Sequence, residues 1–366
     1  MKKHVRTVRD FFIRYERRLA SASLLVGFIV DTLTLRRIDL ISNQLILVWY
    51  LLVLGTGITL INAYQVSIRP SRWLERIYVY LPIIVQFAFG NLFSGFMVLY
   101  SRSTSLIASW PFILLFFLLL IGNELFQPYY LRFRFQSALF FFALLSFFIV
   151  YIPLITGTLG IGTFILSIVV ASAVFLLLLY ALSLKLPALI AREKSKTLMT
   201  IGGIIAVIIL FYGTNVIPPI PLSLEDGGAY HSIERTGAGY RLTHEYGAGG
   251  RFLGRFFTSP TLHLTPGASV YVYSSVFAPT KLSATIVHNW QWFDESKSRW
   301  VSLSDIAFPI SGGRDEGYRG YSTKNVVPEG HWRVDVQTEN GRVIGRIKFN
   351  VTYVEELPRL FTTLRQ

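Results

Sequence analysis

The chain has 366 residues, of which 52% are hydrophobic and only 15% are charged, whereas about 25% of the residues of a typical soluble domain are charged. The net charge of +14 does not indicate a nucleic-acid-binding protein, because such proteins carry basic residues on a folded domain, and here residues 1–224 hold 19 Lys and Arg against seven Asp and Glu. The absence of cysteine excludes disulfides, thiolate catalysis and cysteine-ligated metal sites.

Residues 1–18 form a basic arm, and the first apolar segment follows at Leu19–Leu35. Small residues precede this apolar run, whereas the cleavage site of a signal peptide would follow it, so no cleavable signal peptide is expected. The segment has about the minimum length of a transmembrane helix and contains Asp31. Its role as a span therefore needs an independent criterion.

Five further segments are uncharged over the roughly 20 residues that cross a bilayer. They are residues 40–68, 77–101, 103–123, 136–184 and 197–224. The fourth is too long for one helix, and Thr156-Gly-Thr-Leu-Gly-Ile-Gly162 is expected to divide it, because glycine clusters interrupt helices. Three prolines, Pro218, Pro219 and Pro221, mark the end of the last segment. Six spans are thus predicted besides the first segment.

The distribution of basic residues favours seven spans over six. If Leu19–Leu35 crosses the membrane, 16 Lys and Arg lie on the side of the N-terminus, and only Arg36, Arg37 and Arg102 lie opposite. If it does not cross, the basic residues divide nine against ten. Because basic residues are retained on the cytoplasmic side, the N-terminus is predicted to be cytoplasmic and the C-terminal part to lie across the membrane.

Beyond Pro221 the pattern changes to that of short strands. Segments rich in β-branched and aromatic residues cover Ser269–Val276, Ser283–Phe293, Trp300–Phe308, His331–Thr338 and Arg342–Tyr353. The last two are expected to form a hairpin across Glu339-Asn340-Gly341, because Asn-Gly favours a type I′ turn. Residues 225–257 are rich in glycine, and they are expected to form either one or two edge strands or an irregular linker.

These patterns predict a membrane all-α bundle of about seven transmembrane helices, followed by an all-β, immunoglobulin-like sandwich domain. The predicted parts are a cytoplasmic basic arm (1–18), a seven-span transmembrane domain (19–218), a linker (219–229), a periplasmic β-sandwich (230–353) and a C-terminal tail (354–366). The sequence leaves open whether the tail packs on the sandwich or lies on the membrane.

Two stretches of the predicted sandwich carry a resemblance to a known family. They are Tyr318-Arg-Gly-Tyr-Ser-Thr-Lys-Asn-Val-Val-Pro-Glu-Gly-His-Trp-Arg-Val-Asp-Val336 and Glu339-Asn-Gly-Arg-Val-Ile-Gly-Arg-Ile-Lys-Phe349, with His288-Asn-Trp290 at the start of the pattern. Residues 260–352 resemble the bacterial module called domain of unknown function 2914. Gly27-Phe-Ile-Val-Asp-Thr-Leu-Thr-Leu-Arg-Arg-Ile-Asp39 resembles the multi-span region that precedes this module in inner-membrane proteins of Gram-negative bacteria. The resemblance implies a bacterial inner membrane and a periplasmic module, and it implies no activity.

The first candidate site is a set of polar residues within or at the ends of the predicted spans: Asp31, Arg36, Arg37, Asp39, Asn91 and Glu124. A charge at the bilayer centre costs at least ~2.5–3.5 kcal/mol, so such side chains face protein or water. One interpretation is ion pairing at helix ends, between Asp31 and Arg36 or Arg37, and between Glu124 and Arg132 or Arg134. The other is a polar site for a proton, an ion or a lipid headgroup.

The second candidate is an aromatic and basic cluster in the outer domain. It comprises Trp290, Trp292, Tyr318, Arg319, Tyr321, Trp332 and Arg333, together with Trp300. Trp290 and Trp292 are two residues apart on a predicted strand and so point to the same side. Exposed aromatic rings can stack on sugars with arginine completing a binding surface, whereas tryptophans in a small sandwich can equally form its core.

No metal site, cofactor or catalytic residue is predicted. The closest of the five outer-domain histidines are 13 residues apart, whereas metal ligands are usually closely spaced. No phosphate loop, nucleophile elbow or His-Glu-x-x-His motif is found. The leading hypothesis is a non-enzymatic membrane protein whose sandwich binds a periplasmic protein or glycan. The alternative is a transporter, lipid-handling protein or intramembrane enzyme that functions in the bundle, and a signalling receptor is disfavoured.

Overall fold

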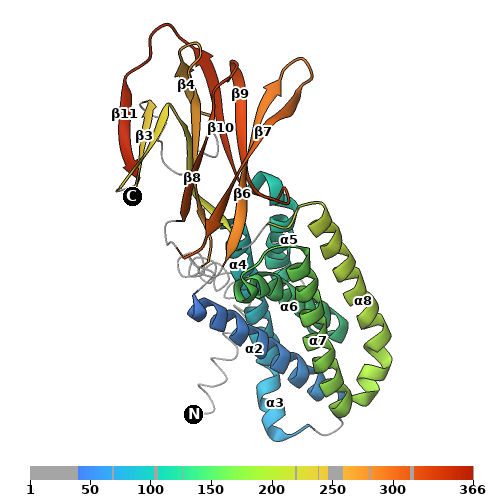
Figure 1. Cartoon of the computed structure of the whole chain (residues 1–366). Helices are drawn as coiled ribbons and strands as arrows, with labels where there is room; N and C mark the ends of the chain where they lie inside the picture. Colours follow the sequence, from blue (N-terminus) through green and yellow to red (C-terminus); the bar gives the residue numbers. More distant parts are fainter. Residues whose placement is uncertain are drawn as a thin grey trace, which may run out of the picture. The chain divides into compact units, whose positions relative to one another are not determined.

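The computed structural model describes residues 40–67, 70–102, 106–125, 127–218, 221–237, 239–245, 259–279, 282–313 and 317–365. The chain divides into two compact units, one helical and one β-rich (Figure 1). The helical unit ends at Ile217, and the main part of the β-rich unit begins at Pro218.

The helical unit contains α2 (Ile41–Val66), α3 (Arg72–Tyr78), α4 (Leu81–Arg102), α5 (Leu106–Leu125), the 3-10 helix η1 (Gln127–Leu131), α6 (Phe133–Thr156), α7 (Ile161–Lys185) and α8 (Pro187–Gly213). Among the described residues, five helices are long and apolar enough to cross a membrane, namely α2, α4, α6, α7 and α8. The segment predicted at 103–123 forms α5, whose apolar part, Ser109–Gly122, is shorter than these five. The segment predicted at 19–35 lies outside the described residues.

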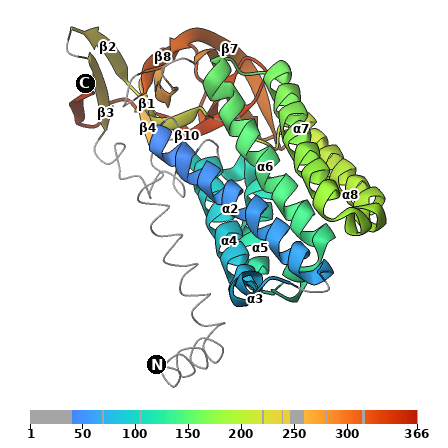
Figure 2. The ribbon, with the colours of Figure 1, turned by 90° about the horizontal axis from the view of Figure 1, so that it is seen from below.

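The break predicted between 156 and 162 is confirmed, because α6 ends at Thr156 and α7 begins at Ile161. Gly157 between them takes a φ of 69°, which glycine adopts without strain. The predicted start of the last segment at Thr197 is wrong, because α8 already begins at Pro187. Only Leu186 separates α8 from the end of α7, and the two helices lie side by side (Figure 2). Hydropathy detects only the apolar part of α8, and its first turns carry the charged residues.

Aromatic side chains form the centre of the helical unit. Phe93 and Tyr100 of α4 are fully buried. The ring centroid of Phe116, on α5, lies 6.5 Å from that of Phe93 and 5.2 Å from that of Tyr100. Phe142 of α6 lies 5.4 Å from Phe116, so the same group joins three helices. At the beginnings of α6 and α8, Arg134 and Glu193 form an ion pair at 3.3 Å.

The β-rich unit has three sheets, which comprise β1 (Ser223–Tyr230), β2 (Ser232–Thr236), β3 (Gly239–Glu245), β4 (Thr261–Leu264), β5 (Val270–Phe277), β6 (Ser283–Asp294), β7 (Arg299–Ser311), β8 (Tyr318–Lys324), β9 (Gly330–Thr338), β10 (Val343–Tyr353) and β11 (Leu360–Arg365). A three-stranded sheet has the order β1-β5-β8, and a five-stranded sheet has the order β4-β10-β9-β6-β7. A small third sheet has the order β11-β3-β2. Every pairing between described strands is antiparallel except that of β4 with β10.

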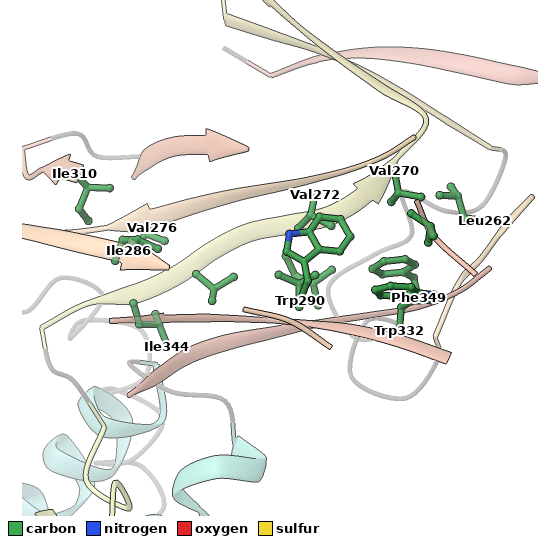
Figure 3. Close-up of a cluster of buried hydrophobic side chains, with 14 of the residues drawn as sticks. Leu262, Val270, Val272, Val276, Ile286, Trp290, Ile310, Trp332, Ile344 and Phe349 are labelled. Carbon is green, nitrogen blue, oxygen red and sulfur yellow. The ribbon is translucent and has the colours of Figure 1, made fainter. Parts of the chain in front are cut away.

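One hydrophobic core joins the three-stranded and five-stranded sheets. Val272 of β5 contributes from the first, and Trp290 and Trp332 contribute from β6 and β9 of the second (Figure 3). The small sheet has a separate cluster, in which Ile233 and Leu242 pack with Tyr230 and Tyr273. Since Tyr273 lies on β5, the small sheet covers the side of the three-stranded sheet that faces away from the core.

Most strand predictions are confirmed, and the differences have local causes. Glu339-Asn340-Gly341 does connect β9 to β10, but Gly341 has a φ of 75° and Asn340 is not among the described residues with positive φ. A type I′ turn needs positive φ at both central residues, so the hairpin instead has a turn closed by the hydrogen bond from Gly341 N to the Thr338 carbonyl, with Gly341 in the left-handed region. Residues 223–229, mostly predicted as linker, belong to β1, and the predicted tail contributes β11, which pairs with β3.

Candidate functional site

The structure does not bring the predicted aromatic and basic cluster together on one surface. Trp290 and Trp332 are 0% and 1% exposed, and their rings lie 6.2 Å apart in the core (Figure 3). Trp290 Nε1 donates to Ser322 Oγ at 3.0 Å, and Trp332 Nε1 donates to the carbonyl of Pro328 at 2.9 Å. Both rings are therefore packed and satisfied within the core, so they do not form a surface.

The remaining members of the cluster lie on two different sheets. Trp292 and Tyr318 are partly buried and pack against the core from its margin. Tyr321 of β8 is 40% exposed on the opposite side of the three-stranded sheet, and Arg319 shares that side by alternation. Arg333 belongs to β9 of the five-stranded sheet.

The predicted intramembrane site falls largely outside the described part of the chain. This holds for Asp31, Arg36, Arg37 and Asp39, and for the side chain of Glu124. Asn91 Nδ2 donates to the carbonyl of Phe87 in its own helix at 2.8 Å. Arg134, one of the two predicted partners of Glu124, is paired with Glu193.

Another pair of polar residues in the helical unit was not singled out from the sequence. Asn62 of α2 and Gln136 of α6 are fully buried, and Asn62 Nδ2 donates to Gln136 Oε1 at 2.8 Å. Gln136 also donates to the carbonyl of Tyr130. The amide pair therefore joins two apolar helices by a hydrogen bond that has no competition from water. Two amides inside uncharged apolar segments were the signal in the sequence.

A connected set of polar side chains lies on the side of the five-stranded sheet that faces away from the core, here called the outer face. Asn289 and Gln291 of β6 alternate with the core residue Trp290 and therefore point to this side. Gln291 Nε2 donates to Asp335 Oδ2 of β9 at 3.3 Å and also to Asn289 Oδ1. Arg346 of β10 donates from Nε and Nη2 to the two oxygens of Asp335 at 2.5 and 2.8 Å. One continuous network thus crosses three strands.

A β-bulge extends this network to β7. The register between β6 and β7 shifts by one residue between Trp290 and Gln291, where Ser304 and Ser302 are the respective partners. The extra residue turns both Ser302 and Asp305 toward Asn289. Asn289 Nδ2 consequently donates to Ser302 Oγ at 2.7 Å and to Asp305 Oδ1 at 2.5 Å.

Arg333 lies at the aromatic end of the outer face. Its Nε donates to Gln291 Oε1 at 2.7 Å, and its guanidinium lies 4.4 Å above the Trp300 ring. Phe293 in turn meets Trp300 edge-on at 5.2 Å. Burial and the positive charge of Arg346 lower the pKa of Arg333, although Asp335 acts in the opposite direction. The outer face therefore combines hydrogen-bonding groups with a partly desolvated cation and two aromatic rings.

Two histidine-containing networks occur elsewhere in the β-rich unit. His288 is fully buried. Its Nε2 lies 2.7 Å from Ser274 Oγ, and its Nδ1 lies 2.7 Å from Ser322 Oγ. Burial lowers the pKa of His288 to about 3, so this ring is neutral at pH 7. Its buried position and its two hydroxyl partners assign it to the core.

The second network is centred on Glu245, which is 7% exposed at the end of β3. Its two carboxylate oxygens lie 2.9 Å from His231 Nε2 and 2.7 Å from His263 Nδ1. Burial alone raises the pKa of Glu245, but the hydrogen bonds from His263 and His231 outweigh it and lower the pKa. Among the described residues, no group of three or more His, Cys, Asp or Glu is arranged to hold a metal ion.

Comparison with known proteins places the outer face in a recognised module. Residues 283–351 match the family described as protein of unknown function (DUF2914). These residues include β6, β7, β9 and most of β10, which carry the network. No curated protein matches the sequence.

Two solved structures show only distant likeness. β-Glucosidase from Listeria innocua in complex with glucose is 17% identical to this chain. The alignment covers 34% of this chain and 17% of the β-glucosidase chain, with a TM-score of 0.19. Alkylpurine DNA glycosylase AlkC from Pseudomonas fluorescens, bound to DNA containing an abasic site analogue, is 8% identical, with coverages of 84% and 98% and a TM-score of 0.22. These TM-scores define neither the fold nor the activity of this chain.

The chain has several helices that are long and apolar enough to cross a membrane, and a β-rich region follows them. This architecture is compatible with a membrane protein. The C-terminal region of this chain carries a DUF2914 module, as the sequence resemblance predicted.

Proposed function

We propose that the chain is a multi-pass protein of a bacterial inner membrane, with a cytoplasmic N-terminus and a periplasmic β-rich unit. Five apolar helices of sufficient length support this proposal. The ion pair between Arg134 and Glu193 brings the basic beginnings of α6 and α8 to one end of the helical unit. The positive-inside rule requires this arrangement if both ends are cytoplasmic.

The β-rich unit is, in this proposal, an immunoglobulin-like sandwich. Two sheets enclose one core, and a buried tryptophan, Trp290, lies on β6, an interior strand of the larger sheet. Both features are typical of such sandwiches. The small sheet covers the outer side of the three-stranded sheet through Tyr230 and Tyr273. The outer face of the five-stranded sheet is then the polar surface left for a ligand, and within its network Asn289 and Asp335 are themselves buried.

The ligand of the outer face is, in this proposal, an envelope glycan rather than a protein. The single observation that carries this is the network of amides, carboxylates and guanidinium groups from Asn289 to Arg346, beside the rings of Trp300 and Phe293. Sugars present adjacent hydroxyls, which such groups bind in pairs, and apolar ring faces, which pack on aromatic side chains. A protein partner would favour an apolar centre over a polar network.

The test is co-sedimentation of the detergent-solubilised full chain with purified peptidoglycan sacculi. The double variant Trp300→Ala, Gln291→Ala should reduce binding by about fivefold or more, the effect of losing ~1 kcal/mol. Tyr321→Ala, on the other sheet, should bind like the wild type. Equal binding by the wild type and the double variant would contradict the glycan proposal.

A second candidate function is favoured by one observation in the helical unit. Asn62 Oδ1 is buried and accepts no hydrogen bond from a described residue. Unpaired polar groups are costly in a membrane and are frequently functional, which supports a transporter, a lipid-handling protein or an intramembrane enzyme. Deletion of residues 225–366 separates the two candidates: a phenotype like that of the complete deletion favours the β-rich unit, and an intact phenotype favours the helices.

A further inference from the structure

We propose that the outer face holds the anionic group of its ligand, a carboxylate or a phosphate, between Arg333 and Lys348. This inference rests on the proposed glycan-binding function and specifies the chemical class of the glycan. The site lies within the DUF2914 module, and it is built from β9 and β10.

Arg333 and Lys348 are direct cross-strand partners in the register of β9 and β10. Their neighbours Trp332 and Phe349 are buried in the core, so both cations point to the outer face by alternation. Residues directly opposite each other in an antiparallel pair have Cβ atoms about 4.5–5.5 Å apart, and like charges in such positions repel. The sheet therefore places two cationic side chains in adjacent positions on the outer face.

The carboxylates of the outer face are engaged elsewhere. Both oxygens of Asp335 accept hydrogen bonds from Arg346, and Asp305 accepts one from Asn289. Within the described part of the chain, no carboxylate forms an ion pair with Arg333 or Lys348. Asp335 acts on Arg333 electrostatically but is itself paired with Arg346, so neither cation of this pair has an ion-pair partner of its own among the described residues.

The two cations differ in a way that suits one bound anion. Arg333 is held in place by Gln291 and by the Trp300 ring, and no described residue accepts a hydrogen bond from its Nη1 or Nη2. Lys348 is exposed, and its ammonium is carried on a long aliphatic chain with several rotatable bonds. A fixed guanidinium with two free NH2 groups can orient a carboxylate or phosphate, and a flexible ammonium can close on it. Such an anion would be paired with both cations.

The test is isothermal titration of the full chain in detergent with a matched pair of sugars and with inorganic phosphate. The sugars are a muramyl disaccharide with its free carboxylate and the same compound as its methyl ester. The acid should bind about tenfold more tightly than the ester, as expected for charge-assisted hydrogen bonds. The preference should decrease at high salt.

Three variants accompany the titration. Lys348→Gln changes an exposed residue and should remove most of the preference for the acid, and Arg333→Gln should remove it as well. Arg241→Gln is the matched control, because it removes the same charge from an exposed pair with Glu234 on the small sheet. It should leave the preference unchanged.

The possible results distinguish this inference from the proposal on which it rests. If acid and ester bind equally to the wild type, the anion site is refuted and glycan binding stands. If neither sugar binds but phosphate does, with loss in Lys348→Gln, the anion site stands and glycan binding is refuted. If none of the three probes binds, both are refuted.

Discussion

Arg346 on β10 donates two hydrogen bonds to the buried carboxylate of Asp335 on β9, at 2.5 and 2.8 Å. The side chains are 15% and 5% exposed, so removing one partner leaves a charge that is nearly buried and unpaired. Asp335→Ala should therefore destabilise the β-rich unit by about 3 kcal/mol. The measurement is the urea midpoint for proteolysis of this unit in the full chain. Asp335→Leu combined with Arg346→Met should restore much of the loss, and no recovery would contradict the explanation.

Burial of His288 makes the stability of the β-rich unit dependent on pH. Its pKa is about 3 in the folded chain and about 6.5 when unfolded. The unfolded state therefore binds more protons between these values, and stability is lost as the pH falls below about 6.5. Between pH 7 and pH 5 the loss from this residue should be about 2 kcal/mol.

His288→Gln should remove this part of the pH dependence, because glutamine does not titrate. The change in unfolding free energy between pH 7 and pH 5 is compared for the wild type and the variant. Since Glu245, His231 and His263 are present in both chains, the difference isolates His288. Identical slopes would show that His288 is not buried in its neutral form.

The two buried tryptophans should behave as core residues. Trp332 is 1% exposed and packs with Trp290 and Phe349. Trp332→Ala should cost about 3–5 kcal/mol, which is typical of a large aromatic residue removed from a core. Tyr321→Ala, at a 40% exposed position, should cost less than ~1 kcal/mol in the same urea experiment. A small effect of Trp332→Ala would argue for a surface position.

Gly341 should be required for the loop between β9 and β10. Its φ is 75°, and no heavy atom lies within 4 Å of an added Cβ, so only backbone strain opposes a side chain. Gly341→Ala should destabilise the unit by about 1 kcal/mol. Gly341→Asn should be milder, because asparagine tolerates the left-handed region. Gly237→Ala, where the added Cβ also meets open space, should be nearly neutral.

The strands of the β-rich unit were largely predictable, because β5, β6, β7, β9 and β10 alternate apolar and polar residues around one core. β8 was not predicted as a strand, although its residues carried the family resemblance. The first strands are glycine-rich and give a weak strand signal. In the helical unit, hydropathy found the apolar centres of the helices. It did not find the start of α8, whose first turns are charged and extend beyond the apolar part.

The candidate site was harder to predict than the fold. Tryptophans drew attention from the sequence, yet Trp290 and Trp332 form the core, and of the eight residues in the predicted cluster only Arg333 and Trp300 lie on the outer face. Asn289, Gln291, Asp335 and Arg346 are individually ordinary polar residues of strands. They become a network only through the register of three strands, and Ser302 and Asp305 join it through a bulge that has no clear sequence signal.

Binding of the ligand to the outer face of the five-stranded sheet can be measured by photo-crosslinking in intact cells. A photoreactive amino acid is placed in the full chain at Ser302 on the outer face or, as the control, at Thr323 on the three-stranded sheet. Adducts that a muramidase trims to a smaller size are expected at Ser302, and none are expected at Thr323. Adducts at Thr323 alone, or adducts at Ser302 that resist muramidase, would contradict glycan binding at this face.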